Sequence, residues 1–438
     1  MSRSRASVRV TLALIAAATT ALAGCGAGSR TAAATATAVP CDFPAPAQAT
    51  SVHVLAYNSS AIDPYTNTMV ASCSKNNVTL SHEPIDFSGQ VQKTTATLAG
   101  DSGTYDILET YGFVIPGYAA DKKLRPLDDL VSQFSDKYQL GAINADMRKA
   151  MSYDGKLYAL PMQSQMFVLA YRKDVFTSLG LKPPATFAEM RDDAAKIQQS
   201  GKVKYPIALP WLASADIVTA FDAALGSLGV DMTDPKTKTA NFDKPAATKA
   251  FEELRSLLPY MDPQVTTFDQ PRVQQQMYNG SAAMAIMFSG RMSDLVKPQN
   301  SRFAQQFAFA PPPSVAGGNV LYDALSVDGW SIPANTKADP KMLFEMMASS
   351  VSPEASKASL PAAYPARDGI VTGGSSPYAA AARESIAKAP PAEPYPWTSR
   401  ISTQVTPVIA SVVTGKTSIP DGLAQMQQIA DRILSEYK

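Results

Sequence analysis

The sequence predicts an α/β protein of two lobes with a mainly parallel, doubly wound sheet. Short apolar segments typical of strands alternate with longer segments of helical periodicity, which is the order of βαβ units. The chain has 438 residues, of which 45% are hydrophobic. One hydrophobic core rarely serves more than about 250–300 residues, so two domains of ordinary size are expected.

The N-terminus carries a targeting signal. Three arginines precede an apolar run at residues 10–23, which is far too short to span a membrane and ends in Leu-Ala-Gly directly before Cys25. This pattern resembles a lipoprotein signal peptide over residues 1–24, and in that family of signals the cysteine thiol takes a diacylglycerol and becomes the mature N-terminus. An ordinary signal peptide cut elsewhere is the alternative. We therefore expect an extracytoplasmic protein anchored to the cell membrane by lipidated Cys25.

The mature chain is expected to begin with a flexible segment and to carry a small negative net charge. Residues 25–50 are rich in Ala, Thr, Ser and Pro, so they predict a flexible tether behind the lipidated cysteine. Removal of the leader lowers the Lys and Arg total from 39 to 36 against 38 Asp and Glu, which makes the mature net charge about −2. That balance attracts neither nucleic acid nor lipid headgroups, and no nucleic-acid partner is expected.

The two remaining cysteines predict a disulfide. Once Cys25 is committed to lipid, Cys41 and Cys73 form an even pair in an oxidising compartment. Two unpaired thiols are the alternative. A metal site is not expected, because two Cys lack the further Cys or His ligands that such a site needs.

The first elements of the fold are strands separated by helices. Folding is expected to begin at a strand over residues 51–57, where apolar and polar side chains alternate. A polar loop and a helix containing Cys73 follow, and further strands are expected at residues 78–80 and 105–108.

The middle of the chain repeats this order. Residues 167–171 read as a buried strand, and Thr186 and Glu189 form a capping box at the start of the next helix. Gly201 can end that helix, because glycine readily adopts the left-handed conformation. Later elements are a helix that opens at residues 243–245 and a central strand at 282–287.

The sequence offers little for catalysis. His53 and His82 are the two histidines, and neither has the spacing of a metal site. The chain carries no nucleophile elbow, no phosphate-binding loop and no dinucleotide fingerprint. Paired acids such as Asp192-Asp193 fall on polar helix faces, where solvation explains them. We therefore expect no reaction, no cofactor and no metal, with a glycosidase built on two converging carboxylates as the alternative.

Several motifs together carry a family resemblance. The strongest stretch reads DGKLYALP at 154–161, YRKD at 171–174 and PPATFAE at 183–189. Weaker matches stand at 103–107, 124–128, 278–284, 360–367 and 414–416. The sequence strongly resembles the family 1 extracellular solute-binding proteins of ABC importers, and the similarity covers roughly residues 50 to 438.

The resemblance implies a periplasmic-binding-protein-like fold, with two doubly wound lobes joined by hinge strands around a central ligand cleft. The chain would cross between the lobes near residues 163–165, 315–321 and 364–368, so each lobe is discontinuous. Lobe 1 would then hold residues 51–163 and 322–365, and lobe 2 residues 164–321 and 366–438. A monomer is expected.

Ligand contacts are expected in loops at strand ends that face the cleft. Sugars present hydroxyls and apolar C–H faces, so their sites combine aromatic rings with Asp, Glu, Asn, Gln and Arg. From lobe 1 the candidates are Tyr57, Asn58, Ser59, Glu109, Thr110, Tyr111, Asp328 and Trp330. From the hinge and the opposite lobe they are Gln163, Gln165, Trp211, Ser289, Arg291, Arg367 and Trp397.

Trp211 is the preferred aromatic contact. It follows a predicted strand and Pro210, and we expect it to stack on the ligand while Asp328 hydrogen-bonds the same ligand from the other lobe. The alternative for each aromatic candidate is a place in the hydrophobic core. Arg291 could instead pair with Asp294 on the following helix.

The resemblance therefore implies a lipid-anchored receptor that binds a sugar or oligosaccharide and delivers it to the permease subunits of an ABC importer in the membrane. A polyol, a glycerophosphodiester, a small peptide or another polar solute is the alternative within transport. A secreted glycosidase and an adhesion lipoprotein are the alternatives from other classes.

Overall fold

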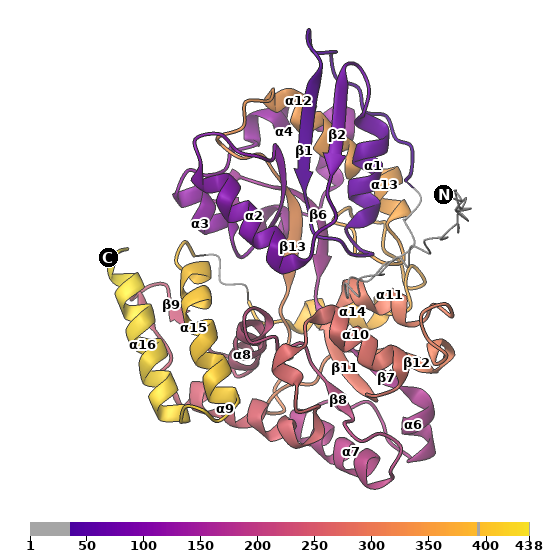
Figure 1. Cartoon of the computed structure of the whole chain (residues 1–438), viewed down its shortest axis with the longest axis vertical. Helices are drawn as coiled ribbons and strands as arrows, with labels where there is room; N and C mark the ends of the chain where they lie inside the picture. The colour runs from indigo at the N-terminus through magenta and orange to yellow at the C-terminus, as the bar shows by residue number, and fades with distance from the viewer. Residues whose placement is uncertain (1–35, 392–394, 438) are drawn as a thin grey trace, which may run out of the picture.

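The structure is a computed structural model that describes residues 36–391 and 395–437. It has two lobes stacked along the long axis of the molecule, each with its own sheet (Figure 1). This confirms the predicted two-lobed α/β fold. The expectation of a mainly parallel sheet was wrong, because antiparallel strand pairs in each lobe make both sheets mixed. Among the described residues, no helix is both long and apolar enough to cross a membrane.

Lobe 1 is built on a five-stranded sheet. In spatial order its strands are β2 (Val78–His82), β1 (Thr50–Leu55), β3 (Ile107–Tyr111), β13 (Ser326–Ser331) and β6 (Leu160–Gln165). β1 runs parallel to β2 and β3, whereas β13 runs antiparallel to β3 and β6. The helices are α1 (Asp63–Cys73), α2 (Phe87–Ala99), α3 (Ile115–Ala120), α4 (Asp128–Tyr138), α5 (Ala145–Ala150), α12 (Pro340–Ser350) and α13 (Pro353–Ala358). A small hairpin of β4 (Ser152–Tyr153) and β5 (Lys156–Leu157) lies between α5 and β6 in the chain.

Lobe 2 is built on a four-stranded sheet. Its strands, in spatial order, are β12 (Phe307–Ala310), β7 (Phe167–Arg172), β11 (Met284–Phe288) and β8 (Ile207–Ala208). β7 runs antiparallel to β11 and β12. The helices are α6 (Lys173–Ser178), α7 (Phe187–Gln199), α8 (Asp216–Ser227), α9 (Pro245–Leu257), α10 (Gln270–Asn279), α11 (Met292–Leu295), α14 (Ala379–Lys388), α15 (Thr398–Val413) and α16 (Ile419–Ser435), with a hairpin of β9 (Thr233–Asp234) and β10 (Thr239–Ala240). Short 3₁₀ helices span Leu140–Ala142 in lobe 1 and Leu258–Tyr260, Val265–Thr267, Ser289–Arg291 and Ala304–Gln306 in lobe 2.

The chain passes between the lobes beside the sheets. β6 and β7 are separated by Met166 alone, so one continuous extended segment belongs to both sheets. A second connection runs from the end of β12 to the start of β13, and a third leads from α13 to α14. These connections lie where the two lobes meet (Figure 1).

Local signals act as the sequence predicts. The Thr186 hydroxyl accepts a hydrogen bond from the Glu189 amide at 3.1 Å, while the Glu189 carboxylate accepts one from the Ala185 amide at 2.7 Å. Gly201 follows the C-cap of α7 with a φ of 71°, and Gly280 ends α10 with a φ of 79°, both in the left-handed region that glycine adopts without strain.

The predicted disulfide is present. Cys41 and Cys73 are bonded, and both are fully buried in the core of lobe 1. The bond ties the segment before β1 to the last residue of α1, and Val39 adds a hydrogen bond from its amide to the Ser72 hydroxyl at 3.1 Å.

Candidate functional site

A polar cluster lies where β6 leaves lobe 1. Asp328 of β13 is buried, and its carboxylate accepts hydrogen bonds from the side-chain amides of Gln163 at 3.0 Å and Gln165 at 2.8 Å. Burial raises the pKa of Asp328 to about 6, although these hydrogen bonds oppose the shift. Gln165 also approaches the Tyr57 hydroxyl at 3.4 Å, so the cluster joins the hinge strand to the loop after β1.

Glu109 extends this cluster along β3. It is fully buried, and one carboxylate oxygen accepts a hydrogen bond from the Tyr57 amide at 2.9 Å. Burial, and next the charge of Asp328, raise the pKa of Glu109 well above its usual range. Within the described part of the chain, the second Glu109 oxygen and the side-chain oxygen of Gln163 have no hydrogen-bond partner.

The loop after β1 folds around a carboxylate. The Asp63 side chain accepts hydrogen bonds from the Asn58 side chain at 3.0 Å and from the Ser59 amide at 3.2 Å. Asp63 is the first residue of α1, a position that favours an acid because of the helix dipole. Burial nevertheless raises the pKa of Asp63 to about 6.

Lobe 2 contributes a positively charged side chain, Arg291, near the polar cluster. Arg291 is buried, and its charge lowers the pKa values of Tyr57 and Asp63 in lobe 1 and of Asp216 in lobe 2, against the larger effect of burial on each. No hydrogen bond or ion pair of the Arg291 guanidinium is found with residues 36–391 or 395–437. Asp294 instead contacts Lys297 at 2.6 Å and accepts a hydrogen bond from the Ser60 hydroxyl at 2.5 Å.

The Ser60–Asp294 hydrogen bond joins the two lobes. The lobes also come close together at Gly290. A Cβ atom placed on this residue would lie 2.9 Å from the Cβ of Ala61 and 2.9 Å from the Gln165 side-chain oxygen. The loop after β1 and the turn after β11 are therefore in direct contact, and only a glycine leaves room for it.

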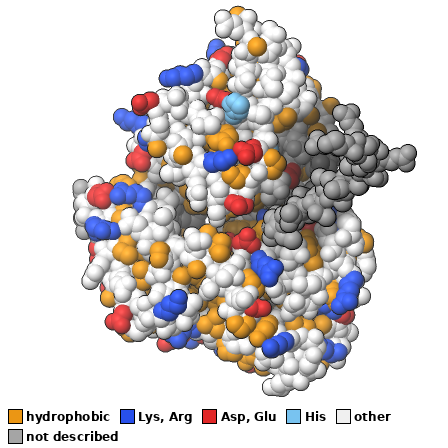
Figure 2. Space-filling model, viewed as in Figure 1, with side chains coloured by type: hydrophobic (Ala, Val, Ile, Leu, Met, Phe, Trp, Pro, Cys, Tyr) orange, Lys and Arg blue, Asp and Glu red, His pale blue; other side chains and the backbone are white. Residues whose placement is uncertain are grey.

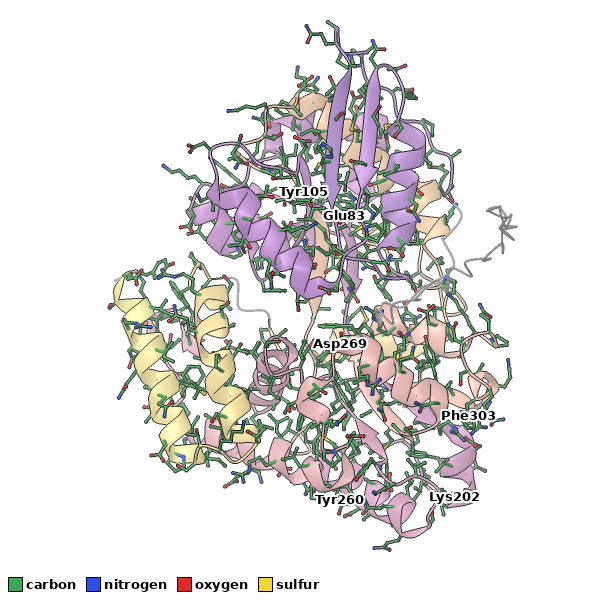
Figure 3. All side chains as sticks on the ribbon, in the orientation of Figure 1. Glu83, Tyr105, Lys202, Tyr260, Asp269 and Phe303 are labelled. Carbon is green, nitrogen blue, oxygen red and sulfur yellow. A yellow bond between two sulfur atoms is a disulfide. The ribbon has the colours of Figure 1, made fainter. Side chains whose placement is uncertain are left out.

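A small pocket of about 10 Å³ lies in lobe 2 and shares no lining residue with the polar cluster, but the charge of Arg291 acts on its Asp216. It is lined by Phe167, Pro210, Asp216, Thr219, Ala220, Gln270, Ile286, Phe288 and Tyr322. Burial, and next the charge of Asp269, raise the pKa of Asp216 to about 7. Asp269 caps α10 and lies at the edge of lobe 2 that faces lobe 1 (Figure 3). On the face in view, the surface is hollowed between the two lobes (Figure 2).

A larger pocket of about 310 Å³ lies elsewhere. Its lining includes Lys202 and Phe303, which lie at the end of lobe 2 away from lobe 1 (Figure 3). The Arg172 guanidinium there stacks on the Phe303 ring at 3.6 Å from its centroid and pairs with Asp174 at 2.6 Å. This pocket shares no lining residue with the polar cluster.

The three tryptophans all lie in hydrophobic cores. Trp211 is fully buried in the core of lobe 2 and Trp330 in the core of lobe 1, and neither indole nitrogen has a partner among the described residues. Trp397 donates to the Thr233 hydroxyl at 3.0 Å and stacks on Tyr395. Packing in the hydrophobic cores is thus sufficient to explain why each tryptophan is buried. A ligand contact by any of them stays a prediction.

Three other candidates also have structural partners. The Arg367 guanidinium donates to the backbone carbonyls of Val351, Gln139 and Tyr138, all in lobe 1. Thr110 lies in β3, and its hydroxyl forms a hydrogen bond with the Ser331 hydroxyl of the neighbouring strand β13 at 2.7 Å. Ser289 is buried beside the crossing strand and donates its amide to the Met166 carbonyl at 2.8 Å.

The structure therefore brings together one part of the predicted site. Its members are Tyr57, Asn58, Ser59, Glu109, Tyr111, Gln163, Gln165, Arg291 and Asp328. Sequence reasoning missed Ser60 and Gly290, which contribute to the contact between the lobes, and Asp63, around which the loop after β1 folds. A signal existed for Ser60, because it ends the polar loop after the first predicted strand.

The arrangement suits a neutral, hydroxyl-rich molecule. Carboxylates and amide oxygens accept hydrogen bonds from hydroxyls, and buried acceptors without a partner gain most from such a donor. No group of three or more His, Cys, Asp or Glu side chains that could hold a metal ion occurs in the described residues. Both histidines have other partners, since His53 contacts the Ser81 hydroxyl and His82 the Ala56 carbonyl.

The buried carboxyls predict a pH dependence of stability. Asp63 and Asp328 have folded pKa values of about 6, and Asp216 and Asp323 of about 7, all above the ordinary value of 3.8. The folded state therefore holds more protons than the unfolded state between about pH 4 and pH 7, and stability falls as the pH rises through this window. We expect the melting temperature to be higher at pH 5 than at pH 7.5, by about 3 °C or more.

Scanning calorimetry across that pH range measures the effect, and Asp328→Asn is the matched variant. The asparagine oxygen can still accept from both glutamines but cannot titrate, so the pH dependence should become shallower. His82, whose pKa burial lowers, acts in the opposite direction. A melting temperature that rises steadily from pH 5 to pH 7.5 would contradict the expectation.

Comparison with known sequences gives a family match. The model of the family described as bacterial extracellular solute-binding protein matches residues 74–356. A Brucella abortus protein described as a putative binding protein is 28% identical over 218 residues, covering 48% of this chain and 50% of that protein. A maltotriose-binding protein of Pyrococcus abyssi is 29% identical over 164 residues, covering 37% and 33%. The chain thus spans about half the length, or less, of these curated relatives.

Solved structures share the fold over nearly the whole chain. An ABC transporter solute-binding protein of Agrobacterium vitis, with bound D-mannitol, has a TM-score of 0.76 at 21% identity and covers 88% of this chain and 99% of its own. One of Agrobacterium radiobacter, in complex with ribitol, has a TM-score of 0.78 at 19% identity and covers 89% and 100%.

Proposed function

The chain belongs to the bacterial extracellular solute-binding protein family, and from this premise we propose that it is a receptor for a sugar or polyol, which it binds between its lobes and delivers to an ABC import permease. Related sequences include a maltotriose-binding protein and a mannitol-binding protein, and two of the solved structures hold D-mannitol and ribitol. These three solutes, maltotriose, mannitol and ribitol, carry many hydroxyls and no charge, which is the chemistry that the polar cluster suits.

The observation that carries this proposal is the pair of unpartnered acceptors in the polar cluster. Glu109 and Gln163 each keep one buried side-chain oxygen without a partner among the described residues. Leaving such an atom unpaired in a water-poor site is costly, and a ligand hydroxyl would satisfy it. An ionised phosphate or carboxylate has only acceptor oxygens and could not satisfy these atoms, whereas hydroxyls can donate to them, so a neutral, hydroxyl-rich solute is favoured over an anionic group at this place.

The proposed contacts follow from this placement. Glu109, Gln163, Gln165 and Asp328 would accept or donate hydrogen bonds to the hydroxyls, and Tyr57 and Tyr111 would pack on the apolar C–H face. Arg291 would reach the ligand from lobe 2, because it lies against groups of both lobes.

Binding would favour the closed arrangement of the lobes. A solute that contacts both lobes binds the closed form more tightly than the open form, so it shifts the equilibrium toward closure. The permease would recognise that closed form. No reaction is part of the proposal, in contrast to a glycosidase, which would turn its ligand over.

A thermal-shift screen of residues 26–438 tests the receptor. The panel holds monosaccharides, oligosaccharides, D-mannitol, ribitol and sn-glycerol-3-phosphate, each at millimolar concentration. A ligand that binds only the folded state raises the melting temperature by mass action. A shift with an uncharged sugar or polyol, and recovery of that compound intact, would support the proposal. A shift with sn-glycerol-3-phosphate alone would contradict a neutral solute, and release of a cleaved product would indicate a glycosidase.

The membrane anchor is a separate part of the proposal. Cys25 lies outside the residues that the structure describes, so the support is the leader pattern that ends at this cysteine. We expect Cys25→Ser to move the protein from the membrane fraction to the supernatant, because acylation needs the thiol. Fractionation with immunoblotting measures this, and Cys41→Ser is the control that leaves Cys25 in place. Equal membrane retention of Cys25→Ser and the parent would refute the anchor.

A further inference from the structure

We propose that the solute is a carbohydrate of several sugar rings, and that Phe87 and Phe113, which flank Tyr111 of the proposed inner site, form an outer subsite for it at the rim of lobe 1. This inference rests on the proposed function and extends it, because it distinguishes an oligosaccharide from a monosaccharide or a short polyol. Nothing in the family match or in the polar cluster alone makes that distinction.

The first observation is where large apolar side chains are exposed. In the described part of the chain these are Phe87 at 38% exposure, Val91 at 38% and Phe113 at 45%. Phe87 and Val91 lie one helical turn apart at the start of α2, and Phe113 follows β3 by two residues. Apolar side chains that gather at one place on the surface of a folded protein mark a binding site.

The second observation is a continuous row of aromatic rings. The ring centroids of Tyr57 and Phe87 are 6.0 Å apart, those of Phe87 and Tyr111 5.5 Å, and those of Tyr111 and Phe113 5.5 Å. Tyr111 and Phe113 are stacked with an interplanar angle of 9°. Tyr111 is buried and contacts both Phe87 and Phe113, which are the exposed rings of the row. A single sugar ring is about the size of one aromatic side chain, so these two exposed rings offer a surface for a further sugar beyond the polar cluster.

The row begins at the polar cluster. Tyr57 approaches Gln165 at 3.4 Å through its hydroxyl and donates its amide to Glu109. Glu109 and Tyr111 lie two residues apart on β3, so their side chains point to the same face of the sheet. The rings therefore lead from the buried acceptors outward to the exposed Phe113, along one path.

The outer rings are held in place. The Gln90 side chain donates to the Glu109 carbonyl at 2.8 Å and accepts from the Tyr111 hydroxyl at 3.3 Å, which fixes α2 against β3. Asp86 caps the same helix by accepting from the Gly89 amide at 2.7 Å. A preorganised aromatic surface of this kind loses little side-chain entropy when a ligand binds.

Contact with lobe 2 does not cover the exposed rings. The lobes already touch through Ser60 and Asp294, yet Phe87 and Phe113 stay exposed. α2 lies on the side of lobe 1 that faces lobe 2 (Figure 1). A ligand that starts at the polar cluster and extends toward this side would cover the rings that lobe 2 leaves open.

The test measures how affinity depends on the number of sugar units, in the parent protein and in variants that lack one aromatic ring. Calorimetric titration of residues 26–438 is done with D-mannitol, glucose, and maltose, xylose and chitin oligosaccharides of two to six units. We expect affinity to rise with the number of units in one of these series. Phe113→Ala and Phe87→Ala should each weaken the longest binder of that series by about tenfold or more. They should change the binding of its shortest binder by less than about twofold.

Val91→Ala is the matched control. Val91 has the same exposure as Phe87 and lies on the same helix, but it is outside the row of rings. It should change every affinity by less than about twofold, and all three variants should melt within about 2 °C of the parent, because these side chains are exposed.

Other outcomes separate this inference from the receptor proposal. A monosaccharide or D-mannitol that binds as tightly as any oligosaccharide, or a Phe113→Ala variant that binds the longest ligand like the parent, would refute the outer subsite and leave the receptor intact. Loss of solute uptake in cells by Phe113→Ala with unchanged titrations would refute it too, by assigning the rings to permease contact. Failure of every carbohydrate to bind the parent would refute both proposals.

Discussion

Replacing Trp211 with alanine is expected to lower the free energy of unfolding of the ligand-free protein by about 3–5 kcal/mol, the usual cost of removing a large buried aromatic side chain. Trp211 has no exposed surface and belongs to the core of lobe 2, together with Phe167 and Tyr322. Alanine would leave a cavity that the surrounding strands and helices can close only in part.

Urea unfolding followed by circular dichroism measures this loss, with Phe113→Ala as the control. Phe113 is also aromatic but is exposed, so its removal should change the unfolding free energy by about 0.5 kcal/mol or less. A Trp211→Ala protein that is as stable as the parent, but binds its sugar more weakly, would assign Trp211 to the ligand instead of the core.

Gly290→Ala is expected to weaken ligand binding by about tenfold or more, because it would hold the lobes apart. A Cβ at this position would meet the Ala61 Cβ at 2.9 Å, and that atom cannot rotate away from its backbone. The Gln165 oxygen lies equally close, and its side chain is held by Asp328. The two loops must therefore separate, which removes the closed form that binds the solute.

Titration with the solute found by the screen gives the affinity, and small-angle scattering with saturating ligand gives the compactness. Gly141→Ala is the matched control, because a Cβ at Gly141 meets no atom within 4 Å. The control should bind and close like the parent. Parent-like affinity of Gly290→Ala would show that closure does not depend on this contact.

The fold could be predicted in most of its parts because its signals are local. Thr186, Glu189 and Gly280 act through their own backbone neighbours, so a single sequence contains all that determines them. The disulfide follows from cysteine number and compartment. The antiparallel placement of β13 between β3 and β6 could not be predicted, because it pairs residues more than 150 positions apart.

The site was harder, because burial depends on packing between distant segments. Trp211 and Arg367 belong to residue types common in sugar sites, but neighbouring elements use them for a core and for three backbone carbonyls. Conversely, Phe87 lies in a segment that carries no motif, and only the pairing of α2 with β3 places its ring beside Tyr111. Tyr57 and Glu109 became candidates because Tyr57 ends the first predicted strand and Glu109 follows the predicted strand at residues 105–108, although Glu109 lies within β3 in the structure.

The Cys41–Cys73 bond determines how a mechanical load enters the molecule. β1 begins only at Thr50, so a pull on the chain ahead of Cys41 reaches the disulfide before it reaches the sheet. The force then passes through a covalent link into the end of α1, and the hydrogen bonds between β1, β2 and β3 are not peeled apart. In the proposed lipid-anchored receptor, lobe 1 would therefore be the lobe held at the membrane, and closure would move lobe 2 relative to it through the extended connecting segments.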